Sequence, residues 1–434
     1  MTSTLALSAT PHRLNSPTIH RLPNGLTIIA EQIPVDAIHL SLWLGMGSSV
    51  ETDSINGMAH YLEHMIFKGT GCLQSGEFER LIEQRGAVTN AATSQDYTQY
   101  YITTAPKDFA ELAPHQIEVV LNAAIPDEAF ERERSVILEE IRRANDNPQR
   151  RMFYRAMQVG FDHLPYRRPV LGPAAVVEQL TAQQMRDFHA QWYQPQAMTA
   201  VAVGNLPVEQ LIETLVNGFA EAEARRSASR SVSTAHPTSH PLESAYTSIV
   251  REELIDNSLQ QARLTMMWRV PGMAELSQTY PLDVLAAVLG QGRTARLVRD
   301  LREDRHLVSS IGVSNMTYTR QGLFYISAQL PADNIAQVET AIAQHIHRLQ
   351  TEPVTEVEIQ RIRTIVTNRY IFGNESPGDR AGLYGYYHAV LGNIEPALLY
   401  PTMLQSLDAD ELSAAAQRYL NPSAYGAVVM RPAG

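Results

Sequence analysis

The chain of 434 residues contains a single cysteine, Cys72. An intrachain disulfide is therefore impossible, and the cytoplasm, where thiols stay reduced, is the expected compartment. Because Cys72 has no second cysteine to share a metal ion with, we interpret it as chemically inert. The residues before Glu31 lack acidic side chains and show no basic region ahead of an apolar patch, which argues against a secretory signal and leaves an organelle matrix as the second interpretation.

Long apolar runs and an excess of positive charge are absent as well. No window approaches the 18 or so uninterrupted apolar residues of a membrane-spanning helix, so we expect no membrane span. The formal net charge of −11 argues against nucleic-acid binding, which requires a basic face. A solubilising acidic surface explains this charge most simply, although it also permits an acidic cavity that attracts basic peptides.

Short strand-like runs alternate with amphipathic helical segments in the first half of the chain. Strands are predicted at residues 25–32, 38–48, 97–104 and 198–206, the first of them entered through a turn at Asn24-Gly25. Helices are predicted at residues 110–124, 127–144 and 181–193. Asp127 and Thr181 are the expected N-caps of the last two helices.

A Ser-, Pro- and Thr-rich stretch without periodicity, residues 223–246, indicates a linker. The alternation then resumes, with strands predicted at 261–270, 322–330 and 425–430 and helices at 281–290 and 293–304. Because this order echoes the first half, we predict an α+β fold with two similar domains, residues 1–222 and 247–434. Each is expected to consist of a mainly antiparallel sheet packed against helices.

The segment GMAHYLEHMIFKGT, residues 57–70, contains His60, Glu63 and His64 within five positions. On a helix, positions i and i+4 share one face, so both histidines can reach one zinc ion while Glu63 acts as general base towards a zinc-bound water. A string of this kind should arise by chance in roughly a few per cent of similar chains, so a buried helix with two incidental histidines is the alternative. The neighbouring apolar residues favour the metal site, because buried ionisable groups are costly unless they are paired or metal-bound.

A catalytic zinc site needs a third protein ligand. The acidic helix predicted at 127–144 offers Glu140, which follows His64 by 76 positions, and Glu133, which lies two helical turns earlier on the same face. Glu139 is the adjacent competitor, and a solvated charged face is the alternative interpretation of this helix.

These segments resemble the pitrilysin-type metallopeptidases, or inverzincins, in the two-domain branch of the mitochondrial processing peptidase subunits and their bacterial relatives. The resemblance rests on residues 22–29, 43–70, 85–101, 130–141, 170–195 and 289–304, and so covers nearly the whole chain. It implies a zinc-dependent endopeptidase that cleaves unfolded or extended peptides, with one zinc per chain. It makes His60, His64 and Glu140 the zinc ligands, Glu63 the general base, Glu133 a supporting residue, and Asn90 and Ala91 part of an edge strand that binds the substrate backbone.

One position departs from the family pattern. Active members carry an arginine followed seven positions later by a tyrosine, and both contact the substrate. Arg302 fits this pattern, but Ser309 replaces the tyrosine. We therefore expect a homodimer, or a heterodimer with a related subunit that shares substrate binding. A non-catalytic or substrate-presenting subunit is the alternative function, and basic peptides are a possible substrate class.

Overall fold

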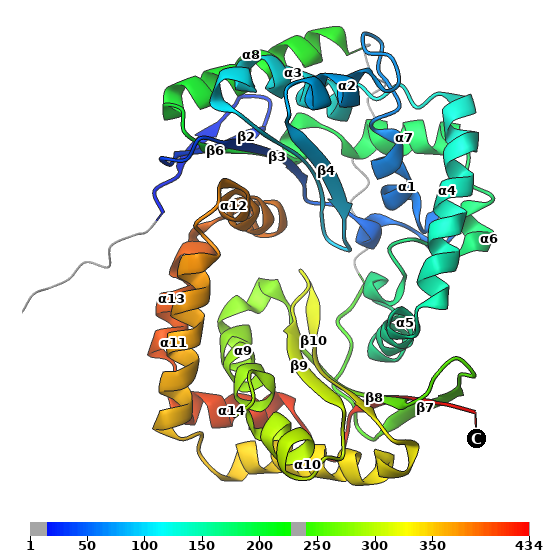
Figure 1. Ribbon diagram of the computed structural model, residues 1–434, viewed down its shortest axis with the longest axis vertical. Helices are drawn as coiled ribbons and strands as arrows, with labels where there is room; N and C mark the ends of the chain where they lie inside the picture. Colours follow the sequence, from blue (N-terminus) through cyan, green and yellow to red (C-terminus); the bar gives the residue numbers. More distant parts are fainter. Residues whose placement is uncertain (1–14, 227–239, 434) are drawn as a thin grey trace, which may run out of the picture.

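The computed structural model describes residues 15–226 and 240–433. Within these ranges, no helix combines the length and the apolar character that crossing a membrane requires. The described chain forms two sheets that face each other across the interior of the molecule, with helices on their outer faces and between them (Figure 1).

The first sheet has six strands in the order β1-β2-β6-β3-β5-β4. Only β2 and β6 pair in parallel, and the other neighbours are antiparallel. Its strands are β1 (Thr18–Arg21), β2 (Thr27–Gln32), β3 (Ile38–Leu44), β4 (Val88–Thr93), β5 (Thr98–Thr104) and β6 (Met198–Gly204).

The second sheet has five strands in the order β7-β11-β8-β10-β9. Its only parallel pair is β7 and β11, so order and direction repeat those of β2-β6-β3-β5-β4. The predicted α+β class with two similar, mainly antiparallel sheets is therefore confirmed. The strands are β7 (Val250–Ile255), β8 (Ala262–Pro271), β9 (Ser310–Met316), β10 (Gln321–Leu330) and β11 (Gly426–Arg431).

Eight α-helices come from the described part of the first half, and six more follow residue 246. The first group is α1 (Met58–Met65), α2 (Glu77–Gln84), α3 (Phe109–Leu121), α4 (Asp127–Asp146), α5 (Pro148–Gly160), α6 (Ala174–Val177), α7 (Ala182–Trp192) and α8 (Val208–Arg225). The second is α9 (Leu276–Gly290), α10 (Ile335–Thr351), α11 (Glu356–Phe372), α12 (Pro377–Leu391), α13 (Glu395–Ser406) and α14 (Ala409–Tyr419), with a π-helical turn η7 (Val298–Asp304) after α9.

Each sheet buries one face against helices of its own half and the other face against a helix of the other half. The main cores lie beneath α3 and α8 in the first half and beneath α9, α10 and α14 in the second. The opposite face of the first sheet packs Trp43 and Val201 against Tyr384 of α12, and that of the second packs Met267 and Val428 against α5. Figure 1 shows α12 under the first sheet and α5 beside the second. The two halves are therefore joined by exchanged helices.

The local predictions can be compared with the structure at single residues. Thr181 forms a reciprocal capping box with Gln184 at the start of α7, and Asn24-Gly25 forms the turn before β2, as predicted. The prediction for Asp127 was wrong: α4 begins at Asp127 itself after Pro126, and its carboxylate pairs with Arg186. Pro126 fixes an extended backbone there and takes the cap position.

The predicted linker, residues 223–246, overlaps the end of α8 at Arg225, and its central residues 227–239 lie outside the described ranges. Residues 240–246 contain no helix or strand. The domain limits given by the sequence stay a prediction.

Candidate metal centre

The helix that carries the two histidines, α1, begins at a tightly packed turn. Gly57 has φ of 101°, and a Cβ there would lie 2.7 Å from the carbonyl oxygen of Leu171, so glycine fits both the backbone and the space. The buried carboxylate of Glu51 accepts hydrogen bonds from the backbone N–H groups of Gly57 (3.0 Å) and Ala59 (2.7 Å) and from the Asn56 side chain (2.8 Å). Glu51 thus satisfies donors that the first turn of α1 leaves unpaired.

Burial raises the pKa of Glu51 to about 7, although the N–H donors of Ala59, Asn56 and Gly57 oppose this effect. Both carboxylate oxygens accept hydrogen bonds, and Arg168 lies close enough to favour the anion. Glu51 therefore fixes where α1 starts and, through it, the positions of His60 and His64.

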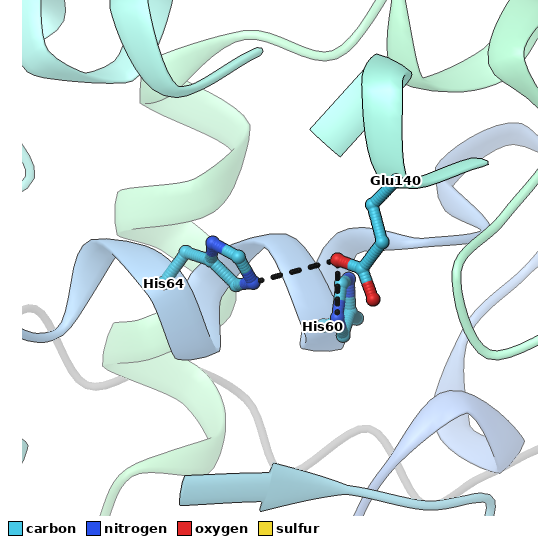
Figure 2. A group of neighbouring side chains, drawn as sticks. All are labelled: His60, His64 and Glu140. Atoms are coloured by element: carbon cyan, nitrogen blue, oxygen red, sulfur yellow. Dashed lines mark ion pairs between the residues drawn. The ribbon is translucent and has the colours of Figure 1, made fainter. Parts of the chain in front are cut away.

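His60 and His64 lie one turn apart on α1 and face Glu140 of α4 (Figure 2). The Oε2 atom of Glu140 lies 3.5 Å from Nε2 of His60 and 3.8 Å from Nε2 of His64. One potential ligand atom from each of the three side chains lies within 4.8 Å of the others. Two nitrogens and one carboxylate oxygen therefore converge on a common point.

The ring of His64 is oriented by a second glutamate. Its Nδ1 lies 2.9 Å from Oε1 of Glu133, whose other oxygen pairs with Nζ of Lys68 at 2.8 Å. Burial raises the pKa of Glu133, but the bonds from Lys68 and His64 outweigh it, so the pKa lies below its usual value. An ionised Glu133 can only accept, so Nδ1 of His64 donates and Nε2 keeps its lone pair directed at Glu140.

His60 is buried, and burial lowers its pKa to about 3, with the positive fields of His64 and Arg150 adding to the effect. Neutral imidazole is the form that ligates metal ions. Burial thus favours the ligating state of His60.

Glu63 precedes His64 on α1 and reaches towards β4. Its Oε2 accepts a short hydrogen bond from the hydroxyl of Thr93, the last residue of β4. Burial raises the pKa of Glu63, against the opposing effects of Thr93 and His64. Glu63 is absent from the cluster of potential ligand atoms, so its carboxylate is available for proton transfer.

Glu139 and Glu140 differ although they are neighbours in sequence. Glu139 pairs with Arg142 and Arg143 on the outer side of α4, and these bonds lower its pKa to about 2. Glu140 instead faces the histidines. Of the two candidates for third ligand, only Glu140 lies in the cluster.

The residues predicted to bind substrate lie in two separate places. Asn90 and Ala91 belong to β4, the edge strand of the first sheet, whose Thr93 reaches Glu63. Arg302 lies on η7 of the second half and pairs with Glu303, while the Ser309 hydroxyl donates to Gln261 and to the carbonyl of Gln329. Among the described residues, no hydrogen bond or ion pair joins Arg302 to the histidine–glutamate cluster.

The donor set fits a zinc ion. Tetrahedral zinc with bonds of about 2.0–2.1 Å holds its donor atoms roughly 3.4 Å apart, close to the 3.5 and 3.8 Å separations between Glu140 and the two histidines. Two histidines and one glutamate leave a fourth position free, which is the arrangement of catalytic rather than structural zinc. The bond from His64 to Glu133 supplies the outer partner that zinc-ligating histidines usually have.

Several residues of the site escaped sequence reasoning. Lys68 lies just beyond the end of α1 and reaches Glu133 because α4 packs on α1, so spacing in the sequence gave no signal for it. Glu51, Thr93 and Arg150 gave no such signal, because the chain topology brings them to α1. Their roles depend on tertiary contacts.

Comparison with known proteins places these observations in context. Residues 27–174 match the family model described as insulinase (peptidase family M16), and residues 179–366 match the model described as peptidase M16 inactive domain. The first match contains α1 and α4, and thus the whole histidine–glutamate cluster.

Relatives match over almost their full length. The chain is 27% identical over 430 residues to an uncharacterized zinc protease of Mycobacterium bovis, which covers 98% of this chain and 95% of the relative. It is 24% identical over 417 residues to zinc protease PqqE of Helicobacter pylori, with coverage of 95% and 92%.

Solved structures share the fold. A protease from Helicobacter pylori matches with a TM-score of 0.88 at 23% identity, over 96% of this chain and 99% of that one. A peptidase M16 inactive domain from Pseudomonas fluorescens matches with a TM-score of 0.83 at 18% identity, over 97% and 99%. The paired-sheet architecture thus recurs in these proteins.

Proposed function

Because the chain belongs to the pitrilysin-type M16 peptidase family, we propose that it is a zinc-dependent endopeptidase. The observation that carries this proposal is the convergence of His60, His64 and Glu140 within 4.8 Å, with Glu63 beside them. His60, His64 and Glu140 would hold one zinc ion.

Zinc held there would supply Lewis-acid polarisation of the scissile carbonyl and would lower the pKa of water towards about 7. As the oxygen of the attacking water bonds to the carbonyl carbon, Glu63 accepts a proton from that water. Glu63 then donates that proton to the amide nitrogen as the C–N bond breaks, which yields a carboxylic acid and an amine. General-base assistance of this kind typically accelerates hydrolysis 10²–10⁴-fold. Thr93 holds the Glu63 carboxylate in position through its hydroxyl.

The edge strand β4 supports a mode of substrate binding. Its open side lies next to α1, and Asn90 is exposed on it. A peptide added as a further antiparallel strand would pair with the backbone at Asn90 and Ala91 and run past Glu63. Only extended or unfolded segments can pair in this way, so folded proteins would be poor substrates.

A second candidate function is a non-catalytic or substrate-presenting subunit of a processing-peptidase-like pair. The replacement of the family tyrosine by Ser309, and the position of Arg302 on η7 away from the chain's own cluster, favour it. The same two residues favour a homodimer or heterodimer in which a second chain completes the substrate contacts. The complete set of His60, Glu63, His64 and Glu140 makes the catalytic function the better supported one.

The test is a digestion of a mixed peptide library by the purified chain, read by mass spectrometry. We expect internal cuts that disappear with a zinc chelator and return when zinc is restored. Cuts that persist with chelator would assign the activity to a contaminating peptidase. Cuts that appear only with a related subunit and are unaffected by Glu63→Gln in this chain would replace the proposal by the second function.

A further inference from the structure

A cavity of about 1410 Å³ lies against the second sheet. It is bounded by the start of α5, the strands β8, β9 and β10, and the helices α9, α11, α12 and α13, which surround the interior in Figure 1. Its volume exceeds that of ordinary small-molecule pockets, and it would accommodate several residues of an extended peptide.

The charged residues that line this cavity are mostly cationic. Arg150, Arg263 and Arg369 contribute positive charge, and Asp283 is the only acidic residue among the described lining residues. The negative net charge of the chain permits an acidic cavity, but the residues that line this cavity carry a positive net charge.

Asp283 does not neutralise these arginines. Its buried carboxylate accepts hydrogen bonds from Nδ2 of Asn315 (2.8 Å) and from the hydroxyl of Tyr400 (3.1 Å). Burial raises the pKa of Asp283 to about 6, against the effect of these two donors. Among residues 15–226 and 240–433, no carboxylate lies within ion-pair distance of Arg150, Arg263 or Arg369.

Of the three cavity arginines, Arg263 is the one with a buried unpartnered nitrogen. It stands on β8, opposite Gln329 of β10, on the same side of β8 as Thr265. Its Nε atom is buried and has no hydrogen-bond partner among the described residues. A buried unpaired donor on a charged group is unfavourable, and the guanidinium fork matches a carboxylate in two-point geometry.

Arg150 connects this cavity with the metal centre. It stands in the first turn of α5, directly after α4, which carries Glu140. Its charge contributes to the lowered pKa of His60, so it lies within electrostatic reach of the ligand cluster. Arg150 also lines the cavity, so a peptide bound at the cluster and extended past Arg150 would reach the space lined by Arg263.

We propose that this cavity is a subsite for a carboxylate of the peptide substrate, bound by Arg263 and attracted by Arg150 and Arg369. The carboxylate belongs to an acidic side chain or to the free C-terminus beyond the scissile bond. This inference rests on the proposed peptidase function and adds a substrate class to it: peptides with negative charge on one side of the cut.

The test compares four matched fluorogenic peptides. Two have a neutral sequence and two contain one glutamate, and each sequence is made once with a C-terminal amide and once with a free C-terminal acid. We expect the wild-type chain to have a higher kcat/KM for carboxylate-bearing peptides than for the neutral amide. In Arg263→Gln this preference ratio should fall at least about 10-fold, as expected for a lost charge-assisted hydrogen bond. Arg263→Lys keeps the positive charge and should retain part of the preference. Arg80→Gln, on the outer helix α2, should leave the preference unchanged. The glutamate and free-acid arms identify which carboxylate is bound.

A second readout does not depend on catalysis. Fluorescence anisotropy on the Glu63→Gln protein should show tighter binding of the carboxylate-bearing peptides than of the neutral amide. This difference should be lost in the double variant that also carries Arg263→Gln. Equal cleavage and binding of all four peptides would overturn the subsite and leave the peptidase intact. Binding preference without any cleavage by the wild type would support the subsite and contradict the proposed function.

Discussion

At the scale of single residues, the environment of a carboxylate determines its role more than its position in the sequence. Glu139 and Glu140 are adjacent on α4, yet Glu139 pairs with Arg142 and Arg143, while Glu140 faces the two histidines. A helix turns about 100° per residue, so neighbours on α4 point in different directions. The ligand role proposed for Glu140 therefore follows from the face of the helix that packs on α1.

This difference gives the first prediction. Glu140→Gln should lower zinc affinity at least 10-fold, because a neutral amide oxygen replaces the anionic ligand. Glu139→Gln is the matched control, one residue away with the same chemical change, and should keep zinc at the wild-type level. Zinc content after dialysis against a graded chelator measures both. Equal losses, or a larger loss in Glu139→Gln, would reassign the third ligand.

At the scale of elements, α1 depends on an acceptor from outside the helix. Glu51 bonds the N–H groups of Gly57 and Ala59 with both carboxylate oxygens. In Glu51→Gln one oxygen becomes an NH₂ group that faces donors. We expect a loss of roughly 1–3 kcal/mol in the free energy of unfolding, typical of a buried unsatisfied group.

Urea unfolding with and without zinc measures this effect. Glu128→Gln is the matched control, because Glu128 lies in the exposed first turn of α4, and it should change stability by less than about 0.5 kcal/mol. Wild-type stability in Glu51→Gln would show that the cap does not determine where α1 starts.

A buried histidine on α7 is expected to make the stability of the fold sensitive to acid. His189 is buried, with Nε2 at 2.9 Å from the carbonyl oxygen of Val120 on α3, and burial lowers its pKa to about 4. The unfolded chain, with a histidine pKa near 6.5, binds more protons than the native state between pH 6.5 and about 4. Stability should therefore fall as the pH falls through this window, by up to roughly 3 kcal/mol for this residue.

Unfolding free energies of metal-free protein at pH 7 and pH 5 measure this slope without a contribution from zinc loss. His189→Gln removes the titrating group and should make the slope shallower, whereas the exposed His347→Gln should not. An unchanged slope in His189→Gln would assign the acid sensitivity to other groups.

At the scale of the whole molecule, the exchange of α5 and α12 sets the relation between the halves. Each helix packs on the sheet of the half from which it does not come. The candidate metal centre on α1 and α4 lies beside the β4 edge of the first sheet, and the cavity lies on the second sheet, so this exchange sets how the two are placed. The proposed use of both places by one peptide substrate thus depends on the exchange of α5 and α12.

The sequence was informative where function depends on local spacing. His60, Glu63 and His64 can be identified because one helical turn relates them. The strand patterns predicted β2, β3, β5 and β6 of the first sheet and β8, β10 and β11 of the second, whereas β4 was expected only from the family resemblance and β1, β7 and β9 were missed. Glu140 was selected from its neighbours by the family resemblance.

The remaining features depend on contacts between distant segments. Periodicity indicates that a helix has an apolar face but not which sheet covers it, and the two exchanged helices, α5 and α12, were both missed. Thr93 reaches Glu63 and Arg263 reaches the cavity only through strand order.

The central claim is that the cluster binds zinc and that Glu63 performs the proton transfer, and one paired measurement tests it most directly. Zinc content and peptide turnover are measured on the wild type and on Glu63→Gln. We predict about one zinc per chain in both proteins and a loss of turnover of at least about 100-fold in the variant, because glutamine cannot accept the proton. Undiminished turnover in Glu63→Gln, or a folded wild-type chain that binds no zinc, would contradict the account.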